Sequence, residues 1–342
     1  MTYRANDARY GSGMQYRYTG RSGLKLPVIS LGLWQNFGGT RDYPSAFEML
    51  SYAFDKGVTH FDLANNYGPP PGAAEELFGD VMARDFRPYR DEMIISSKAG
   101  WTMWEGPYGD RGSRKYILAS ADQSLKRMGI EYFDIFYSHR YDSETPLEET
   151  MGALAHLHRQ GKALYVGISM YPEKQTREAV RILKDMGVPC LIHQPNYSIL
   201  NRWIEEDGTM AACDDLGVGI IAFSPLQQGI LSGKYNSLRG DLSGTRASEN
   251  YSLSANRLEP RILEAVDTLG EIARARKQTM VQLALAWVLR KKEVTSALIG
   301  IRTLEQLKDC LGVLDNLELS AEEVAAIDAA AKGGMIDSRP GR

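Results

Sequence analysis

Short apolar runs alternate with longer amphipathic stretches along most of the chain. The amphipathic stretches repeat apolar residues at helical spacing, and several end in glycine, which commonly follows a helix C-terminus. They predict helices at 45–57, 73–85, 113–129, 146–161 and 172–187. The apolar runs predict strands at 28–34, 59–64, 93–98, 133–139, 163–169, 190–194, 218–224 and 295–300. These strands are apolar almost throughout, as is typical of parallel strands covered on both faces.

Eight strand–helix units in succession, without a composition break that marks a linker, predict an α/β protein with one (β/α)8 TIM barrel. A chain of 342 residues is ordinary for such a barrel. The alternative is a doubly wound sheet. Its dinucleotide-binding version carries GxGxxG after the first strand, whereas the first strand here continues into GLWQNFGG at 32–39. The pattern therefore favours the barrel.

Two segments depart from the strand–helix alternation. Residues 14–30 read as a two-strand β-hairpin before the first barrel strand, placed to close the barrel bottom. Residues 227–257, after the seventh strand, show little periodicity, and so long a loop is usually a functional lid or disordered. We expect one (β/α)8 barrel domain at 14–331, a polar N-terminal extension at 1–13 and a C-terminal tail at 332–342.

Composition excludes several classes of protein. The chain is 43% hydrophobic and 24% charged, with a formal net charge of −3, so no basic excess indicates nucleic acid or an anionic membrane as a partner. No apolar run approaches the roughly 18 residues of a membrane span, and the N-terminus lacks a secretory h-region. Cys190, Cys213 and Cys310 form neither a disulfide framework nor a CxxC site. We expect a cytoplasmic protein without a metal site.

The C-terminal ends of the predicted strands supply the candidate chemistry, because barrel enzymes place their working residues there. These ends carry Trp34, Asp62, Lys98, His139, Ser169, Gln194, Phe223, Ser224 and Gly300. Taken singly, each has an ordinary structural explanation, such as a loop cap or a solvated strand end. Taken together, the second, third and fourth strands place the ionisable groups of Asp62, Lys98 and His139 at the same end of the barrel. Tyr67 follows Asp62 closely in the sequence.

These groups suit the protonation of a carbonyl oxygen. A free tyrosine has a pKa near 10, too high for an efficient acid at neutral pH. An ammonium at Lys98 would lower the pKa of Tyr67, and a carboxylate at Asp62 would keep that ammonium charged and in place. His139 would orient the carbonyl and share the proton.

With these residues in view, the chain closely resembles the aldo-keto reductases, from about Met14 to Ala331. The motifs HFDLANNYG, SSKAG, YSHR, GISMY, HQPNYS, AFSPLQQGILSGKY and LIGIRTLEQL follow in family order. The family's catalytic tetrad falls on Asp62, Tyr67, Lys98 and His139. Within the family, ANNYGPPPG, MWEGPYG, GSRKY and DIFYSHR resemble the bacterial L-glyceraldehyde 3-phosphate reductases, which are in turn similar to potassium channel β-subunits.

The resemblance implies NADPH-dependent reduction of an aldehyde, with hydride from the nicotinamide and a proton from Tyr67. The residues implied at the nicotinamide are Trp34, Asp62, Ser169, Gln194 and Phe223, the last stacking on the ring. Those implied at the pyrophosphate are Ser224, Leu226, Gln228 and Lys234. Those implied at the adenosine end are Gly300, Arg302, Gln306 and Cys310, with Arg246 closing over it from the long loop.

Three positions depart from the family pattern at the adenosine end. Close relatives tend to read GASR where this chain reads GIRT, so Arg302 replaces a small hydroxyl residue and Thr303 replaces a basic one. Cys310 stands where an asparagine often contacts the adenine. These departures bear on the preference for NADPH over NADH.

The substrate is expected to meet Trp34, Tyr67, Trp101, His139 and Arg140. The aromatic residues would narrow the mouth to a short aldehyde, and cationic groups nearby would attract an anionic one. We therefore expect a glyceraldehyde phosphate to be preferred to methylglyoxal.

Two other functions fit parts of the sequence. A redox-sensing regulatory subunit, like the channel β-subunits, would bind the cofactor with little turnover, but those relatives tend to carry Asn at the position of His139. A Schiff-base aldolase would use Lys98 as its nucleophile. The family branch also often forms tetramers or larger rings, so a homo-oligomer is expected.

Overall fold

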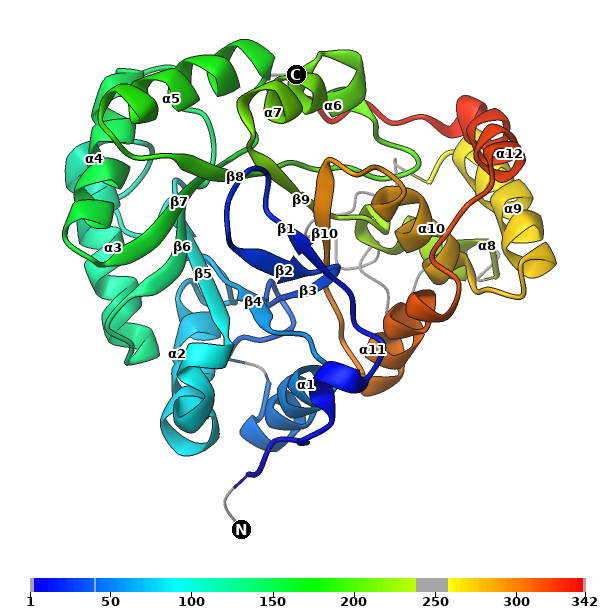
Figure 1. Cartoon of the computed structure of the whole chain (residues 1–342), viewed down its shortest axis with the longest axis horizontal. Helices are drawn as coiled ribbons and strands as arrows, with labels where there is room; N and C mark the ends of the chain where they lie inside the picture. Colours follow the sequence, from blue (N-terminus) through cyan, green and yellow to red (C-terminus); the bar gives the residue numbers. More distant parts are fainter. Residues whose placement is uncertain (1–2, 40, 238–257, 341–342) are drawn as a thin grey trace.

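The computed structural model describes residues 3–39, 41–237 and 258–340. Its centre is a closed barrel of parallel strands in the order β10-β3-β4-β5-β6-β7-β8-β9, with the helices outside (Figure 1). The barrel strands are β3 (Ile29–Gly32), β4 (His60–Asp62), β5 (Ile94–Ala99), β6 (Phe133–Ser138), β7 (Ala163–Ser169), β8 (Cys190–Gln194), β9 (Gly219–Phe223) and β10 (Val294–Ile299). The predicted barrel and its eight strands are confirmed, with every strand end within two residues of the prediction.

Helices follow the strands and bury their apolar faces against the barrel. The five predicted helices form as α1 (Tyr43–Asp55), α2 (Ala73–Val81), α3 (Arg114–Met128), α4 (Leu147–Arg159) and α5 (Glu173–Asp185). The remaining helices are α6 (Trp203–Glu206), α7 (Thr209–Leu216), α8 (Lys234–Ser237), α9 (Pro260–Ala275), α10 (Met280–Leu289), α11 (Leu304–Leu311) and α12 (Ala321–Ala331). Within the described ranges, no helix is long and apolar enough to cross a membrane.

Local sequence explains the helix boundaries. Ser113 accepts a hydrogen bond from the backbone N–H of Tyr116 at the start of α3, and Gly129 takes a left-handed conformation with φ of 62° at its end. Before α10, Thr279 and Gln282 form a reciprocal capping box. These caps satisfy backbone groups that a helix leaves unpaired.

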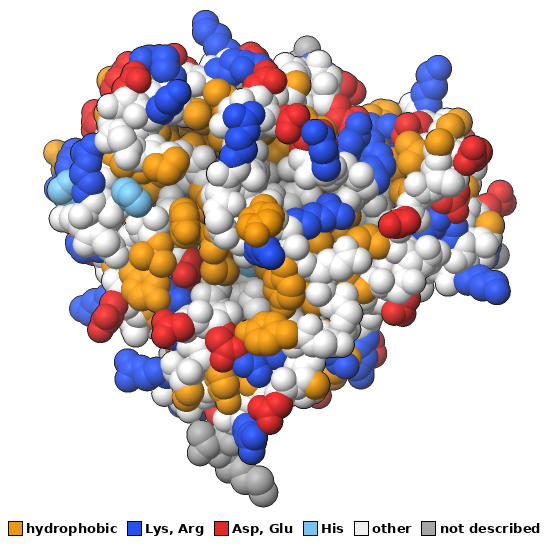
Figure 2. All heavy atoms as spheres, in the orientation of Figure 1, with side chains coloured by type: hydrophobic (Ala, Val, Ile, Leu, Met, Phe, Trp, Pro, Cys, Tyr) orange, Lys and Arg blue, Asp and Glu red, His pale blue; other side chains and the backbone are white. Residues whose placement is uncertain are grey.

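The predicted hairpin is confirmed. β1 (Tyr16–Tyr18) pairs antiparallel with β2 (Lys25–Pro27), and the hairpin crosses the barrel opening (Figure 1). Leu26 is fully buried with barrel residues that include Tyr137 and Ile221. Arg17 donates to the carbonyl of Val294, which begins β10, so the hairpin closes the end of the barrel opposite the strand C-termini. On this face, acidic and basic side chains are interspersed (Figure 2).

Both ends of the described chain pack on the barrel. Tyr3 donates to Asp55 in α1 at 2.7 Å, and the backbone of Ala5 donates to Tyr89 at 2.9 Å. At the other end, Ile336 donates to the carbonyl of Leu200 at 2.7 Å. The segment after β9 begins with a 3-10 turn at Gln227–Ser232 and α8, and the rest of the predicted loop, 238–257, lies outside the described residues.

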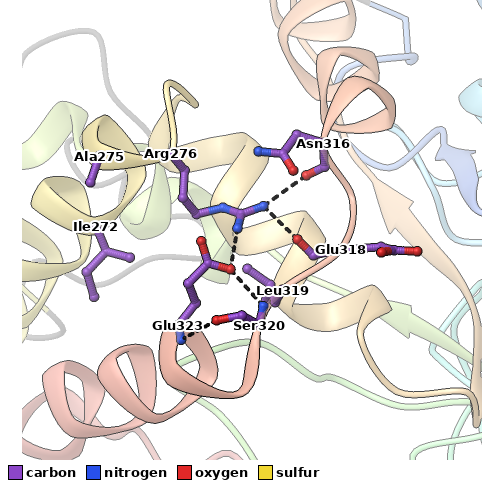
Figure 3. Close-up of a pocket in the computed structure, with 8 residues that line it drawn as sticks. All are labelled: Ile272, Ala275, Arg276, Asn316, Glu318, Leu319, Ser320 and Glu323. Carbon is purple, nitrogen blue, oxygen red and sulfur yellow. Dashed lines mark hydrogen bonds and ion pairs between the residues drawn. The ribbon is translucent and has the colours of Figure 1, made fainter.

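A cavity of about 530 Å³ lies between α9 and α12 (Figure 3). Arg276 crosses it with a side chain that is 6% exposed and pairs with Glu323 at 2.5 Å. The same guanidinium donates to the carbonyls of Asn316 and Glu318 at 3.1 and 2.9 Å, and to Gln278 at 2.7 Å. Each of its three nitrogens thus has a partner, and its role is to tie the C-terminus of α9 to the segment that enters α12.

We predict that Arg276→Met lowers the free energy of unfolding by about 2–3 kcal/mol, because two main-chain carbonyls and one carboxylate lose their donor. Arg181 is the matched control, since its pairs with Glu178 and Asp185 lie on the surface with the guanidinium side chain 56% exposed. Arg181→Met should leave the free energy of unfolding nearly unchanged. Denaturant unfolding measures both, and equal losses would contradict the role given to Arg276.

Candidate active site

The site starts from the register of three neighbouring strands. Asp62 at the end of β4 pairs with Ser96 in β5, and Lys98 in β5 pairs with Tyr137 in β6. This places the Lys98 Nζ atom 2.5 Å from Asp62 Oδ2, 2.6 Å from the carbonyl of Leu63 and 3.3 Å from the Tyr67 hydroxyl. Asp62 and Lys98 are both fully buried. The three predicted residues therefore meet at one ammonium.

Tyr67 is held by the turn that leads from β4 into α2. Its backbone N–H donates to the carbonyl of Ala64 at 3.0 Å, and its carbonyl accepts from Gly72 and Ala74. Asn65, just before it, donates from its backbone to the carbonyl of Lys98 at 3.0 Å. These hydrogen bonds hold the turn to both neighbouring elements. Tyr67 as a whole residue is partly exposed, whereas its hydroxyl lies inward beside the fully buried Lys98.

His139 stands directly after β6, and its ring lies 5.9 Å from the ring of Tyr67 in an edge-on arrangement. Burial lowers the pKa of His139 well below its ordinary value, and the positive charges of Lys98 and Arg140 lower that pKa further. The imidazole is therefore neutral at pH 7. Its Nδ1 atom is buried and has no hydrogen-bond partner in the described part of the chain.

The pKa of Tyr67 departs from the sequence prediction in its net direction. Burial raises the pKa of Tyr67 well above its ordinary value, and the negative charge of Asp62 raises it further. The net direction of the Tyr67 pKa is therefore upward in this structure, and the lowering by Lys98 that the sequence predicts does not set that direction. Burial also lowers the pKa of Lys98, whereas Asp62 and Glu75 raise it. Tyr67 is thus a protonated phenol beside a held ammonium.

Residues predicted at the nicotinamide lie around the same end of the barrel. Ser169 is buried and donates to the backbone carbonyl of Gln194 at 2.7 Å. The Gln194 side chain donates to Asp62 Oδ1 at 3.2 Å. Trp34 and Phe223 are both partly exposed just beyond or at their strand ends. Their placement fits a planar ring between the strand ends.

Residues predicted at the pyrophosphate lie in the turn after β9. Ser224 and Gln228 have φ values of 52° and 56°, so the backbone turns sharply there, and Leu226 is partly exposed between them. The Gln228 Oε1 atom is buried without a partner among the described residues. Lys234 is exposed, with its Nζ atom 4.8 Å from the Tyr235 ring centre. The exposed Lys234 ammonium could pair with a cofactor phosphate, whereas the Gln228 Oε1 atom is an acceptor and could not donate to one. Arg246 lies outside the described residues.

The adenosine end falls at the start of α11. Gly300, Arg302 and Gln306 are exposed there, and the backbone N–H of Arg302 donates to the Gln306 side chain at 2.7 Å. Cys310 is different, because it is 2% exposed and packs in the hydrophobic core. Burial raises the pKa of its thiol to about 12. The structure therefore separates Cys310 from the exposed residues with which the sequence grouped it.

The segment after β5 carries the aromatic residues Trp101 and Trp104, which the sequence predicts near the substrate. Trp101 is 43% exposed, and the Arg140 guanidinium lies 3.9 Å from its ring centre. Arg140 also donates to the Gly100 carbonyl at 2.7 Å and pairs with Asp110 at 3.0 Å. Trp104 packs on Tyr116 with ring centres 5.2 Å apart. Arg140 thus lies beside Trp101, and the carboxylate of Asp110 already pairs with it.

Comparison with known proteins agrees with this geometry. The aldo/keto reductase family model matches residues 28–332. The chain belongs to the aldo/keto reductase family. It is 52% identical to the L-glyceraldehyde 3-phosphate reductase of Escherichia coli K12, over 98% of both chains. It is also 34% identical to a probable voltage-gated potassium channel subunit beta of Oryza sativa, over 96% of this chain and 98% of that one.

Sequence reasoning missed several residues of this aldo/keto reductase site. Ser96 donates to Asp62 Oδ1 at 2.7 Å, and its position two residues before Lys98 on the same strand could have indicated a shared face. Asn65 donates to the Tyr116 hydroxyl at 2.9 Å, which in turn donates to the Trp101 carbonyl. Asp110 had no sequence feature that linked it to Arg140. In the described residues, no cluster of three or more His, Cys, Asp or Glu could hold a metal ion.

Proposed function

We propose that this aldo/keto reductase reduces short aldehydes to alcohols with NADPH, with Tyr67 as proton donor. The observation that carries the proposal is the buried Lys98 ammonium, held by Asp62 and the Leu63 carbonyl and 3.3 Å from the Tyr67 hydroxyl. Family membership supports an oxidoreductase, and NADPH would supply the hydride. Ser169, Gln194 and Phe223 would hold its nicotinamide, while the turn at Ser224–Lys234 and the start of α11 would hold its phosphates and adenosine.

Tyr67 donates its proton to the carbonyl oxygen as that oxygen gains negative charge. A raised pKa keeps the phenol protonated beforehand, and the alkoxide that forms is the stronger base. Lys98 then stabilises the phenolate by charge and by a hydrogen bond. Neutral His139 binds and orients the carbonyl oxygen without adding a second positive charge.

The geometry disfavours a Schiff-base aldolase. A nucleophilic lysine needs an uncharged amine that the substrate can reach. Lys98 is fully buried and directs its donors to Asp62, Leu63 and Tyr67. A regulatory role, like that of the relatives named as potassium channel subunits, would not require the catalytic arrangement of Tyr67 and His139.

The substrate we propose is a short aldehyde with a negative charge, with L-glyceraldehyde 3-phosphate ahead of methylglyoxal. Two observations support it: the relatives named for that reductase activity and the Arg140 guanidinium beside Trp101. Asp110 competes for Arg140, so the preference depends on whether a phosphate displaces that carboxylate. Homo-oligomer formation and a cytoplasmic location stay predictions.

Tyr67→Phe should lower kcat by roughly 10²- to 10⁴-fold, because the general acid is lost. NADPH binding should be retained, since the ring still fills its place. Tyr18→Phe, an exposed tyrosine on the hairpin at the opposite end, is the control. Cofactor oxidation and fluorescence titration measure the two effects, and near-normal turnover of Tyr67→Phe would remove Tyr67 from the mechanism.

Removing Arg302 and Arg246 together should raise the Kd of NADPH about 10- to 100-fold and that of NADH much less. The reason is that a guanidinium can pair with the 2′-phosphate that NADH lacks. Lys308→Met removes an exposed cation that lies within α11 and should affect both cofactors alike. Titration of NADPH and NADH into each variant measures the two Kd values. If the double variant raises both Kd values by the same factor, the proposed role of the arginines in the preference for NADPH is wrong.

Glyceraldehyde phosphate should exceed uncharged glyceraldehyde and methylglyoxal in kcat/KM, and the advantage should shrink as salt screens charge. Arg140→Met should abolish the advantage, whereas Asp110→Asn should increase it by freeing the guanidinium. Lys115→Met, whose ammonium lies 5.3 Å from the Tyr108 ring centre, is the control for charge alone. Equal efficiencies for charged and uncharged aldehydes in the unmodified protein would indicate a general aldehyde reductase.

A further inference from the structure

A row of buried hydrogen bonds crosses the barrel interior and ends at Asp62. Ser296 in β10 lies 2.7 Å from Ser30 in β3, and the Ser30 hydroxyl lies 2.9 Å from His60 Nδ1. His60 Nε2 lies 3.0 Å from the Ser96 hydroxyl, which donates to Asp62 Oδ1 at 2.7 Å. All five side chains have an exposed fraction of 0%.

The carboxylate sets the direction of every hydrogen bond in this row. An ionised carboxylate only accepts, so Ser96 uses its single hydroxyl proton on Asp62. Ser96 must then accept from His60, which requires the Nε2–H tautomer of a neutral imidazole. Nδ1 is left as an acceptor, so Ser30 donates to it and in turn accepts from Ser296. The row therefore runs from Ser296 to Asp62 without two donors facing each other.

The surroundings of His60 favour the neutral ring that this direction requires. Burial lowers the pKa of His60 to about 4; the charge of Asp62 opposes that shift, and the charge of Lys98 adds to it. With both nitrogens occupied by serine hydroxyls, the ring has no unused polar atom. His60 is thus a fixed donor rather than a group that titrates near pH 7.

We propose that His60 and Ser96 are positioning residues that hold Asp62 Oδ1, so that Oδ2 stays directed at the Lys98 ammonium. This inference rests on the proposed function, because its effect on turnover passes through Lys98 and Tyr67. Gln194 also donates to Oδ1, but at 3.2 Å and from a side chain that is expected to contact the nicotinamide. Ser96 is the shorter contact and belongs to the same strand as Lys98.

Loss of this positioning should change the pH dependence of kcat. The titratable groups around Lys98 are Asp62 and His60 from β4, Tyr67 from the following turn, Glu75 from α2, Tyr137 from β6 and His139 directly after β6. Among them, Asp62 raises the pKa of both Lys98 and Tyr67. If Asp62 is released from Ser96, both pKa values fall. The alkaline decline in kcat should then move to lower pH.

The first test is 15N NMR of histidine-labelled protein, which needs no activity. The chain has 5 histidines, and the signals of His60 are assigned by their loss in His60→Gln. We expect a protonated Nε2 and an unprotonated Nδ1 between pH 6 and 8. An Nδ1–H tautomer, or a cationic ring in that range, overturns the direction of the row even if no aldehyde substrate is found.

The second test compares the pH dependence of kcat in serine variants. Ser96→Ala should lower kcat about tenfold or more, change KM less, and move the alkaline decline to lower pH. Ser96→Thr keeps the hydroxyl and should restore most of the rate. His60→Leu should lower kcat and shift the pH profile as Ser96→Ala does. His60→Gln retains an N–H donor, so its effects on kcat and on the pH profile should be smaller.

Ser124→Ala is the control, because Ser124 is equally buried but lies on α3 outside the row. It should lower stability without moving the pH profile. An unchanged pH profile in Ser96→Ala and His60→Leu, or the same shift in Ser124→Ala, overturns the positioning role. If the unmodified protein reduces no aldehyde, the proposed function fails separately, while the NMR result still decides the direction of the row.

Discussion

The fully buried ion pair of Asp62 and Lys98 is the constraint on which the rest of the site depends. Removing two charges from water costs several kcal/mol per ion, and the attraction between them offsets that cost only when the remaining donors and acceptors are satisfied. Here Lys98 also donates to the Leu63 carbonyl, and Asp62 also accepts from Ser96 and Gln194. The result is a charged, buried Lys98 ammonium beside the Tyr67 hydroxyl.

The barrel makes this arrangement possible because parallel strands end at one rim. β4, β5 and β6 are neighbours, so Asp62, Lys98 and His139 come together although they are far apart in the chain. The opposite end is closed by the hairpin through Leu26. Stability and chemistry are thus divided between the two ends, as is usual in barrels.

The barrel and the strand-end residues of the site could be predicted from the sequence, because both follow from patterns along the chain. Apolar runs and glycine-ended helices specify a barrel, and strand ends then locate Asp62, Lys98 and His139. Contacts that arise only from packing could not be predicted. Burial gives the Tyr67 pKa a net upward direction, Cys310 packs in the core, and the partly exposed Arg140 pairs with Asp110. None of these follows from spacing along the chain.

The most direct test of hydride transfer to an aldehyde at this site uses NADPH carrying deuterium at the transferable C4 position. The protein is incubated with it and glyceraldehyde 3-phosphate in ordinary water, and the product is analysed by mass spectrometry. The account predicts one deuterium on the new alcohol carbon for each NADPH oxidised, and almost no product from Tyr67→Phe. A product without deuterium, or a lysine adduct trapped by borohydride in its place, would contradict it.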